Sequence, residues 1–252
     1  MELAEFVWPA VAALPRTTPI VIPIAALEQH GHHMPVFTDS LLLGEVLRRV
    51  KERPVAGQCL FAPLQWFGNS HHHLDFPGTL SASARTYLDL LKDLAHCFIA
   101  HGFTRIVFLN GHGGNIGPSQ QALFELKQEH RNRKELLLLA LTYWEAAGDP
   151  SKTIPNLTQS RMGHACEWET SMMLHLAPDL VVGTVATVPE VPFGEAFAPG
   201  YRAWVMPDRS EPGHIGNPAA ATAEKGAALL AFFAAGVATF LERVVGWDGS
   251  WT

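Results

Sequence analysis

Short, almost wholly apolar runs alternate along this chain with longer segments whose apolar residues recur at helical spacing. This alternation is typical of an α/β protein with a mainly parallel sheet, because parallel strands are joined by helical crossovers. Strands are predicted at residues 19–27, 59–66, 105–110, 135–142 and 180–188. Helices are predicted at 38–50, 81–101, 117–131 and 165–176 and in the Ala-rich stretch 219–240.

Two polar, turn-rich segments, 148–163 and 189–217, are predicted to be loops. The sequence contains no internal repeat and no linker-like stretch. We therefore expect one domain over residues 1–252, which is long enough to bury a large core.

The charge balance excludes some classes of partner. The 252 residues include 18 Lys and Arg against 24 Asp and Glu, a net charge of −6, and no basic stripe of the kind that binds nucleic acid. Three cysteines are too few for a disulfide framework, the N-terminus lacks a basic signal region, and no apolar run reaches the ~20 residues of a membrane span. We expect a cytoplasmic protein that binds a small molecule, not nucleic acid or a membrane.

Histidine is the unusual component, with 13 residues, eight of them in four short clusters. Three of these clusters, within 28–33, 70–73 and 111–115, follow predicted strands. Ligands of open parallel sheets bind beyond the carboxyl ends of the strands, so the clusters are expected at one edge of the sheet. Structural or surface roles are expected for His96, His101, His130 and His175.

Glu28 and His30 follow the first predicted strand, and Asp39 stands at the start of the next helix. Residues two apart on a strand project to the same face, so Glu28 and His30 are expected side by side. Carboxylate and imidazole together are normal ligands of Zn, Mn or Fe, and a carboxylate such as Asp39 can bridge two ions. The alternative is that the first two are polar loop residues and that Asp39, or Thr38 before it, caps the helix.

The sharpest motif is Asn110-Gly-His112-Gly-Gly-Asn115, at a predicted strand-to-helix turn. Its glycines permit unusual backbone angles and close approach of a ligand, and the helix amides that follow favour an anionic oxygen. It lacks the spacing of a phosphate-binding loop. The alternative is a tight turn with a surface histidine.

The fourth cluster, His164, precedes a helix that contains Glu167 and Glu169. Glu169 shares a helix face with Met172 and is expected to point inward, where a buried carboxylate needs a partner such as a metal. Glu167 lies on another face and is expected to be a solvated charge. Cys166, beside His164, is the alternative nucleophile of a metal-free hydrolase, although its acidic neighbours would raise the pKa of the thiol.

Aromatic residues next to the predicted site segments are candidates for stacking on a flat substrate. They are Trp66, Trp144 and Trp168, and core packing explains each of them equally well. Of the adjacent His71, His72 and His73, at most two are expected to face one site from an extended segment. His32 and His33 are further candidates for lining it.

Five motifs occur in a fixed order along the chain: ALEQHGHHMPVFTD, FPGTLS, NGHGGN, HACEWETS and ATAEKG. Together they resemble the creatininase (creatinine amidohydrolase) family from residue 20 to about residue 230. The resemblance implies a three-layer α/β/α sandwich, assembly as a homohexamer and two divalent metal ions per chain. It also implies hydrolysis of cyclic amides, formamides or a peptide-modification intermediate.

The family's motifs imply a metal-ligand set in this chain. Glu28 and His30 resemble its ligands at the first strand end, Asp39 its bridging carboxylate, and His112 the ligand of the NGHGGN motif. Glu169 resembles an acid that lies beside the metals in many members. His164 has the position of the catalytic histidine, and His73 precedes FPGT at the family's spacing, which makes it a substrate-binding candidate.

One departure bears on the substrate. Creatininases proper have a metal-binding glutamate two residues after the histidine of the NGH motif, where this chain has Gly114. Glu169 is therefore expected to supply the missing carboxylate. Gly113 replaces the tyrosine that contacts creatinine, so creatinine is not the expected substrate, and the NGHGGN form is that of the broader hydrolase branch.

These residues predict hydrolysis of a C–N bond in a small cyclic amide or formamide by water activated at two divalent ions. His164 is expected to protonate the leaving nitrogen, as a group titrating near neutral pH can do. Backbone amides of Gly113 and Gly114 are expected to stabilise the oxyanion. The alternatives are a metal-binding protein of the same fold without hydrolytic activity, and a lactone or other ring-opening hydrolase.

Overall fold

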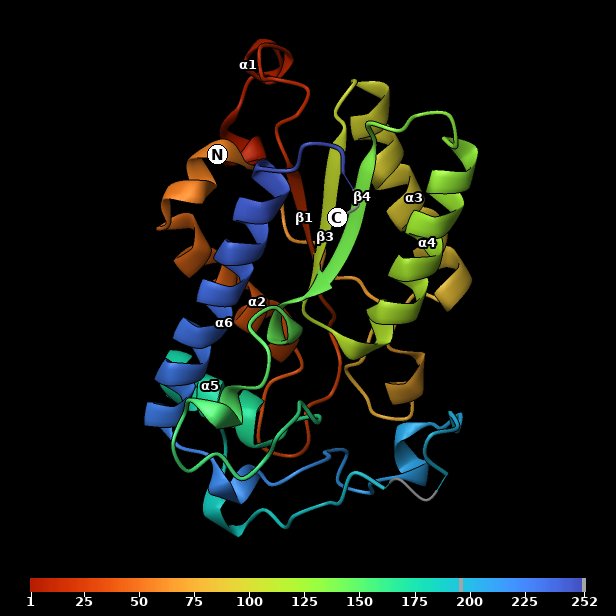
Figure 1. Ribbon diagram of the computed structural model, residues 1–252. Helices are drawn as coiled ribbons and strands as arrows, with labels where there is room; N and C mark the ends of the chain where they lie inside the picture. The colour runs from red at the N-terminus through yellow and green to blue at the C-terminus, as the bar shows by residue number, and fades with distance from the viewer. Residues whose placement is uncertain (195–196, 251–252) are drawn as a thin grey trace.

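A parallel sheet lies at the centre of the computed structural model, which describes residues 1–194 and 197–250 (Figure 1). Its strands, in spatial order, are β2 (Leu60–Phe61), β1 (Ile20–Ile24), β3 (Arg105–Asn110) and β4 (Leu137–Thr142). All the strand pairings are parallel, with Val21 opposite Val107 and Asn110 opposite Thr142. The carboxyl ends of the strands therefore meet at one edge of the sheet, and the prediction of a parallel sheet is confirmed.

Helices cover both faces of the sheet and make three layers, as the resemblance implied (Figure 1). The helices on one face are α2 (Thr38–Lys51), α5 (Glu167–Leu176) and α6 (Ala223–Val245); those on the other are α3 (Ala84–Ala100) and α4 (Ile116–Glu129). A short helix, α1 (Trp8–Ala12), precedes the sheet. Short 3-10 helices occur at Leu3–Glu5, Pro54–Gln58, His71–His73, Gly113–Asn115, Tyr143–Glu145, Pro150–Lys152, Pro178–Leu180, Val185–Thr187, Met206–Asp208 and Pro218–Ala220.

Strand β1 contributes to both core layers because successive side chains of a strand point to opposite faces. Val21 packs in the cluster formed with α2, α5 and α6, whereas Ile20 and Ile22 pack in the cluster formed with α3 and α4. Every residue of this strand is buried. A run of apolar, mostly β-branched residues is what a strand buried on both faces requires.

Two helix starts follow from side-chain caps. Ser83 Oγ accepts a hydrogen bond from the backbone N–H of Thr86, and Thr222 Oγ1 accepts one from that of Lys225, each at 3.2 Å. Helix α2 begins at Thr38 without a side-chain cap. The predicted capping role of Thr38 or Asp39 is therefore wrong, and the carboxylate of Asp39 points elsewhere.

The structure corrects three strand predictions. Residues 180–188 form no strand; a 3-10 turn at Pro178–Leu180 ends where this run begins, another lies within it at Val185–Thr187, and Val182 is 57% exposed. A segment rich in β-branched residues forms a strand only where a neighbouring strand is available to pair with it. The second strand is only two residues long, and β1 ends at Ile24, so Glu28 and His30 lie in the loop beyond it.

Helix α6 is long and apolar enough, by length and composition alone, to cross a membrane. Half of its most apolar window is buried inside the protein, and its residues Leu230, Phe233 and Val237 belong to the core beside the sheet. Its packing against α2 and α5 is that of a core helix.

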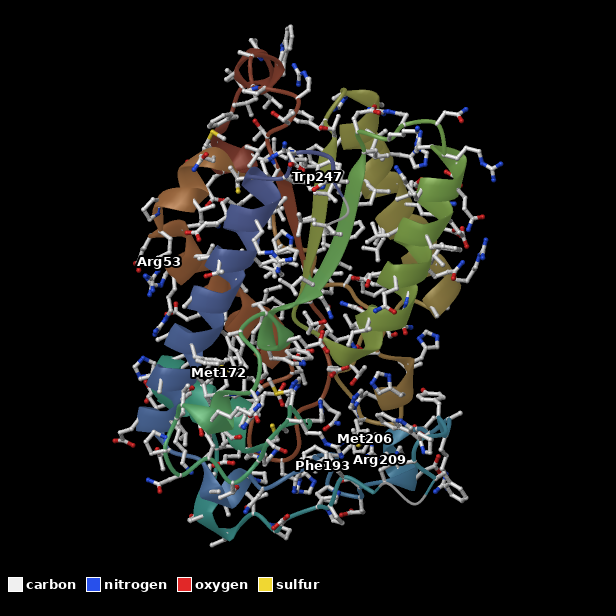
Figure 2. All side chains as sticks on the ribbon, viewed as in Figure 1. Arg53, Met172, Phe193, Met206, Arg209 and Trp247 are labelled. Atoms are coloured by element: carbon white, nitrogen blue, oxygen red, sulfur yellow. The ribbon has the colours of Figure 1, made fainter. Side chains whose placement is uncertain are left out.

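Residues 189–194 and 197–217 run past the carboxyl ends of the strands, below the sheet in the view of Figure 1. Among them, Met206 is fully buried, and Figure 2 shows Phe193, Met206 and Arg209 gathered in this region. This segment forms one wall of the cavity described next.

Candidate metal centre

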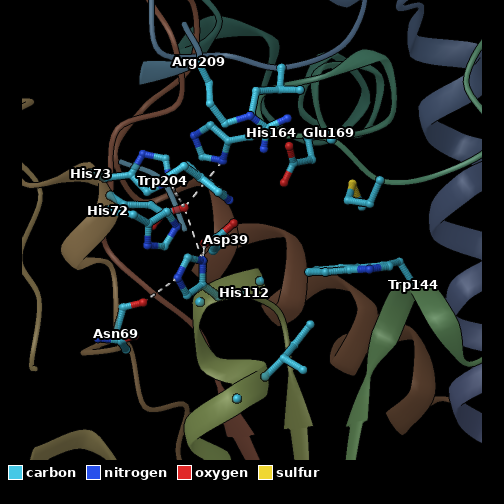
Figure 3. A pocket seen from close by; sticks show the side chains of 18 of the residues that line it. Asp39, Asn69, His72, His73, His112, Trp144, His164, Glu169, Trp204 and Arg209 are labelled. Atoms are coloured by element: carbon cyan, nitrogen blue, oxygen red, sulfur yellow. Dashed lines mark hydrogen bonds and ion pairs between the residues drawn. The ribbon is translucent and has the colours of Figure 1, made fainter. Parts of the chain in front are cut away.

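A cavity of about 750 Å³ opens at the carboxyl edge of the sheet. Each strand is followed by a segment that contributes to its lining: Glu28 after β1, His72 after β2, His112 after β3 and Trp144 after β4 (Figure 3). Helices α2 and α5 add Asp39 and Glu169. The parallel topology therefore brings together polar side chains from segments that are distant in sequence, as expected at the carboxyl edge of an open α/β sheet.

The first group of ligand atoms surrounds His112, a buried side chain. Its Nε2–H donates to the backbone carbonyl oxygen of Asn69 at 2.9 Å, so the neutral ring has its lone pair on Nδ1. That nitrogen lies 3.2 Å from Glu28 Oε1 and 2.9 Å from Asp39 Oδ2. A ring nitrogen of His72 lies within 4.8 Å of ligand atoms of Glu28 and His112.

The second group surrounds His30 and repeats the pattern with the ring reversed. Its Nδ1–H donates to the backbone carbonyl oxygen of Glu28 at 3.0 Å, which leaves the lone pair on Nε2. That nitrogen lies 3.1 Å from Asp39 Oδ1 and 3.8 Å from Glu169 Oε1. Asp39 thus directs one carboxylate oxygen to each group.

The donor set fits divalent cations. In each group a ring nitrogen faces carboxylate oxygens, and their lone pairs repel each other unless a proton on the ring or a bound cation lies between them. Buried oxygens of all three acids, Glu28 Oε2, Asp39 Oδ2 and Glu169 Oε2, have no hydrogen-bond partner. Within residues 1–194 and 197–250, no Lys or Arg forms an ion pair with these acids. Nitrogen and oxygen ligands of this kind suit Zn, Mn or Fe.

Local charge and burial act on these acids in different ways. Burial raises the pKa of Glu169 above its ordinary value. Burial also disfavours ionisation of Glu28, but the nearby His112 and His73 hold the pKa of Glu28 well below its usual range. Burial lowers the pKa of His30, yet Asp39 raises it well above the ordinary value. A positive charge at either group would stabilise the ionised carboxylates further.

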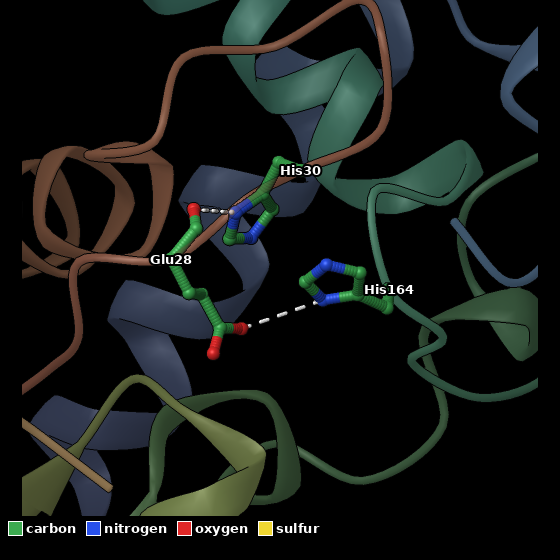
Figure 4. Close-up of side chains that lie close together, drawn as sticks. All are labelled: Glu28, His30 and His164. Atoms are coloured by element: carbon green, nitrogen blue, oxygen red, sulfur yellow. Dashed lines mark hydrogen bonds and ion pairs between the residues drawn. The ribbon is translucent and has the colours of Figure 1, made fainter. Parts of the chain in front are cut away.

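Gln29 orients two further histidines beside the first group, His73 (Figure 3) and His164 (Figures 3 and 4). His164 Nε2–H donates to the backbone carbonyl oxygen of Gln29 at 2.8 Å, so His164 Nδ1 has the lone pair, 3.5 Å from Glu28 Oε1. The Gln29 amide nitrogen donates to Gly213 O and to His73 Nδ1, each at 2.7 Å. His73 therefore directs an N–H, from Nε2, towards Glu28 Oε1 at 3.5 Å. No sequence motif indicated this role of Gln29.

Most of the predicted site residues line this cavity. They include Glu28, Asp39, His73, His112, Gly113, Gly114, Trp144, His164 and Glu169, while His30 is fully buried behind them. His71, His72 and His73 form a 3-10 turn, not an extended segment, and the last two of them reach the cavity.

Several predicted residues lie elsewhere. Trp168 is 2% exposed, packs against Phe233 in the core and is not a lining residue, so the structure contradicts its predicted contact with substrate. Trp66 is 42% exposed on the surface. His33 is buried and 2.9 Å from Thr170 Oγ1, and His32 is exposed; neither lines the cavity.

The expectation of a solvated Glu167 is wrong. Its carboxylate is fully buried, accepts hydrogen bonds from the backbone N–H groups of Thr158 and Gln159, and pairs with Lys225 Nζ at 2.7 Å. The predicted loop 148–163 and the start of α6 enclose this side chain, which helical periodicity within α5 alone does not indicate.

Cys166 lacks the surroundings of a nucleophile. It is fully buried, its Sγ accepts a hydrogen bond from the backbone N–H of Gly163 at 3.4 Å, and it does not line the cavity. Burial, and then the charge of Glu169, raise the pKa of this thiol to about 12. These features contradict the alternative of a Cys166–His164 hydrolase.

Part of the lining was not predicted residue by residue. The segment 189–217 contributes Phe193, Tyr201, Trp204, Arg209 and Ile215. The Pro- and Gly-rich composition marked this stretch as an excursion, but side-chain positions in such a loop depend on the fold around it.

The comparisons with known proteins agree with this geometry. The Creatininase family profile, described as creatinine amidohydrolase, matches residues 4–241. A mycofactocin precursor peptide peptidase of Mycobacterium tuberculosis is 34% identical over 248 residues, 93% of this chain and 88% of that protein. A creatinine amidohydrolase of Pseudomonas putida is 32% identical over 237 residues, 87% of this chain and 86% of that protein.

Among solved structures, a mutant creatininase of the Zn–Zn type superimposes with a TM-score of 0.79. It is 29% identical and covers 96% of this chain and 97% of its own. The similarity thus extends over nearly the whole fold.

Proposed function

The chain belongs to the creatininase family, and from this membership we propose that it is a metal-dependent hydrolase that cleaves a C–N bond of a small cyclic amide or formamide through two divalent ions. The observation that supports this most is the pair of histidine lone pairs, His112 Nδ1 and His30 Nε2, that face different oxygens of Asp39. A neutral imidazole directed at a buried carboxylate is stable when a cation lies between them.

We assign the ligands from these two groups. Glu28, Asp39 and His112 would hold one ion, and His30, Asp39 and Glu169 the other. Glu169 then supplies the carboxylate that Gly114 lacks. Bound divalent ions of this type, whether Zn, Mn or Fe, lower the pKa of a water molecule and polarise a substrate carbonyl.

His164 transfers the proton in this proposal. Burial, followed by the charges of His30 and His73, lowers the pKa of His164 well below its ordinary value, so the ring is neutral at neutral pH. The expectation that His164 titrates near neutral pH is therefore not adopted. With Nε2 held by Gln29, Nδ1 accepts the proton of the attacking water and returns it to the leaving nitrogen as the C–N bond breaks. The protein thus supplies an acceptor first and a donor second.

Other lining residues would bind the substrate. Backbone amides of Gly113 and Gly114 stand at the start of the helical turn before α4 and are suited to an oxyanion. His73 directs an N–H into the site, and Trp144 offers a ring face in the cavity. These residues bind and orient a planar amide beside the ligands.

An activity screen tests the proposal. Wild-type protein loaded with Zn, Mn or Fe is assayed on cyclic amides, formamides, short peptides and lactones, beside Glu169→Gln and the exposed control Glu224→Gln. We expect amide hydrolysis that falls at least ~100-fold in Glu169→Gln and is unchanged in the control. Metal binding without hydrolysis of any compound would favour a binding protein of the same fold, and turnover of lactones alone would favour a ring-opening esterase.

We further propose a cytoplasmic homo-oligomer, a hexamer by family resemblance. Large apolar side chains on the surface, such as Trp8 at 79% and Phe124 at 64% exposure, support association of subunits. Light scattering of the purified protein measures the number of chains directly.

A further inference from the structure

The charge in the cavity is distributed unequally. The three acids lie in the ligand groups, whereas Arg209 is the one Lys or Arg among the lining residues in the described part of the chain. In the view of Figure 3, Arg209 and His164 lie at the top and Asn69 and His112 below. At about 750 Å³, the cavity exceeds what a small cyclic amide needs and has room for a further substituent.

Two contacts hold the Arg209 side chain in place. Its guanidinium carbon lies 4.7 Å from the centre of the Trp204 ring, and its Nη2 donates a hydrogen bond to the backbone carbonyl oxygen of Phe193. Both partners also line the cavity, and the side chain is half-buried. Stacking on a ring immobilises a guanidinium and leaves most of its five N–H donors in the ring plane free to bind.

No counter-charge for Arg209 is found within residues 1–194 and 197–250, where no carboxylate lies at ion-pair distance from it. Burial, and then the positive charge of Arg161 nearby, lower the pKa of Arg209 from its ordinary value. A bound anion would relieve both effects, because it replaces lost hydration and offsets the repulsion between the two arginines.

We infer that Arg209 binds a carboxylate of the substrate, on a part of the molecule remote from the scissile C–N bond. This inference rests on the proposed function, since the cations are taken to hold the amide end. A guanidinium fork matches a carboxylate in a bidentate geometry, which a neutral substituent does not use. The substrate class is thus an amide that bears a free carboxylate, not a neutral ring such as creatinine.

The same arrangement makes carboxylate binding depend on metal. Without cations, Glu28, Asp39 and Glu169 repel an anionic ligand from the cavity. With two divalent ions, the charge of the three acids is compensated, and the field of Arg209 is no longer opposed.

Paired probes test the inference by binding rather than turnover. The half-hydroxamates of malonic, succinic and glutaric acid have a metal-binding head and a carboxylate tail, and their carboxamide analogues differ in the tail alone. Their affinity for Zn-loaded protein is measured by calorimetry. We expect at least one carboxylate probe to bind wild type about tenfold or more tightly than its carboxamide. Arg209→Met should remove this preference, and Arg209→Lys should retain part of it.

Arg202→Met is the matched control, because Arg202 belongs to the same segment but is exposed and does not line the cavity. It should keep the wild-type preference. Equal affinities of both members of every pair for wild type would overturn the inference and leave the proposed function standing. A failure of every probe to bind in a Zn-dependent way would overturn the proposed function, and this inference with it. If Arg209→Met fails to fold, Arg209→Lys and the wild-type pairs decide.

Discussion

His164 donates a hydrogen bond from Nε2 to the backbone carbonyl oxygen of Gln29, 2.8 Å away. The 3.1 Å contact between His164 Nε2 and the Gln29 side-chain nitrogen joins two donors and is therefore not a hydrogen bond. The side-chain nitrogen instead donates to His73 and to Gly213. One residue, placed between Glu28 and His30, thus sets the same Nε2–H tautomer in both rings, and Glu28 Oε1 faces the lone pair of His164 Nδ1 and the N–H of His73 Nε2.

In this account His112 is a metal ligand and His164 is a proton carrier, and substitutions distinguish the two roles. His112→Ala removes Nδ1 from between Glu28 and Asp39 and should lose bound metal and activity together. His164→Ala should keep its metal while kcat falls by about 10²–10⁴-fold, the usual contribution of a general acid–base group. Metal content by mass spectrometry and kcat, measured on both variants, check this. Loss of metal from His164→Ala would make His164 a ligand.

The space around Gly114 is limited by Asn69 and His112, which leave no room for a side chain. A Cβ atom at this position would lie 2.1 Å from Asn69 O and 2.5 Å from His112 Nε2, so it would displace the pair that orients His112. Gly114→Ala should therefore weaken metal binding by about 10–100-fold. A Cβ at Gly113 meets nothing within 4 Å, and Gly113→Ala should keep the wild-type metal affinity. Titration of metal-free protein with Zn measures both, and equal affinities would refute the argument.

The buried pair of Glu167 and Lys225 joins α5 to α6. Lys225→Met leaves the fully buried carboxylate without its charge partner and should lower the free energy of unfolding by about 3 kcal/mol. The additional change Glu167→Gln should recover part of this loss. The exposed Lys134→Met is the control, with an expected change within about 0.5 kcal/mol. Urea denaturation gives all three values; a loss no larger than that of the control would mean that the pair is dispensable.

Thiol chemistry provides an independent check. Burial raises the pKa of Cys59 to about 11 and that of Cys166 to about 12, while Cys97 is exposed. Because the thiolate reacts and its population falls as pH drops below the pKa, native protein near pH 8 should be alkylated at Cys97 alone. Activity should survive this modification. The variant Cys97→Ser should also be active, unless the substitution prevents folding. Peptide mapping after iodoacetamide treatment identifies the site, and inactivation through Cys166 would restore the thiol mechanism.

The sheet and its helices were largely predictable because their signals are local. Residues 105–110 form a strand with the predicted bounds, since the apolar run is bordered by Thr104 and by Gly111. The run 180–188 has similar composition but no strand, because pairing partners are supplied by the rest of the fold. Glu28 and His112 were expected at one edge of the sheet because they follow strands, whereas Asp39 and Glu169 reach the same cavity from helices α2 and α5.

Residues whose roles depend on distant segments were not predictable. Helical periodicity correctly predicted that Glu169 points inward, but it also predicted that Glu167 is exposed. Glu167 is buried against its partner Lys225, which lies 58 positions away along the chain, beyond the reach of a local pattern. Trp168 was next to a site segment but packs against Phe233 in the core. Arg209 and Trp204 lie in an irregular segment, where no periodicity relates a side chain to the cavity.

Metal stoichiometry tests the central claim most directly. Protein stripped with a chelator, assayed, and reloaded with Zn is measured by inductively coupled plasma mass spectrometry beside Glu169→Gln. The two ligand groups that share Asp39 predict two ions per chain in wild type, fewer in the variant, and activity that disappears on stripping and returns on reloading. Stripped wild-type protein that retains full activity, or reloaded protein that binds no ion, would contradict the account.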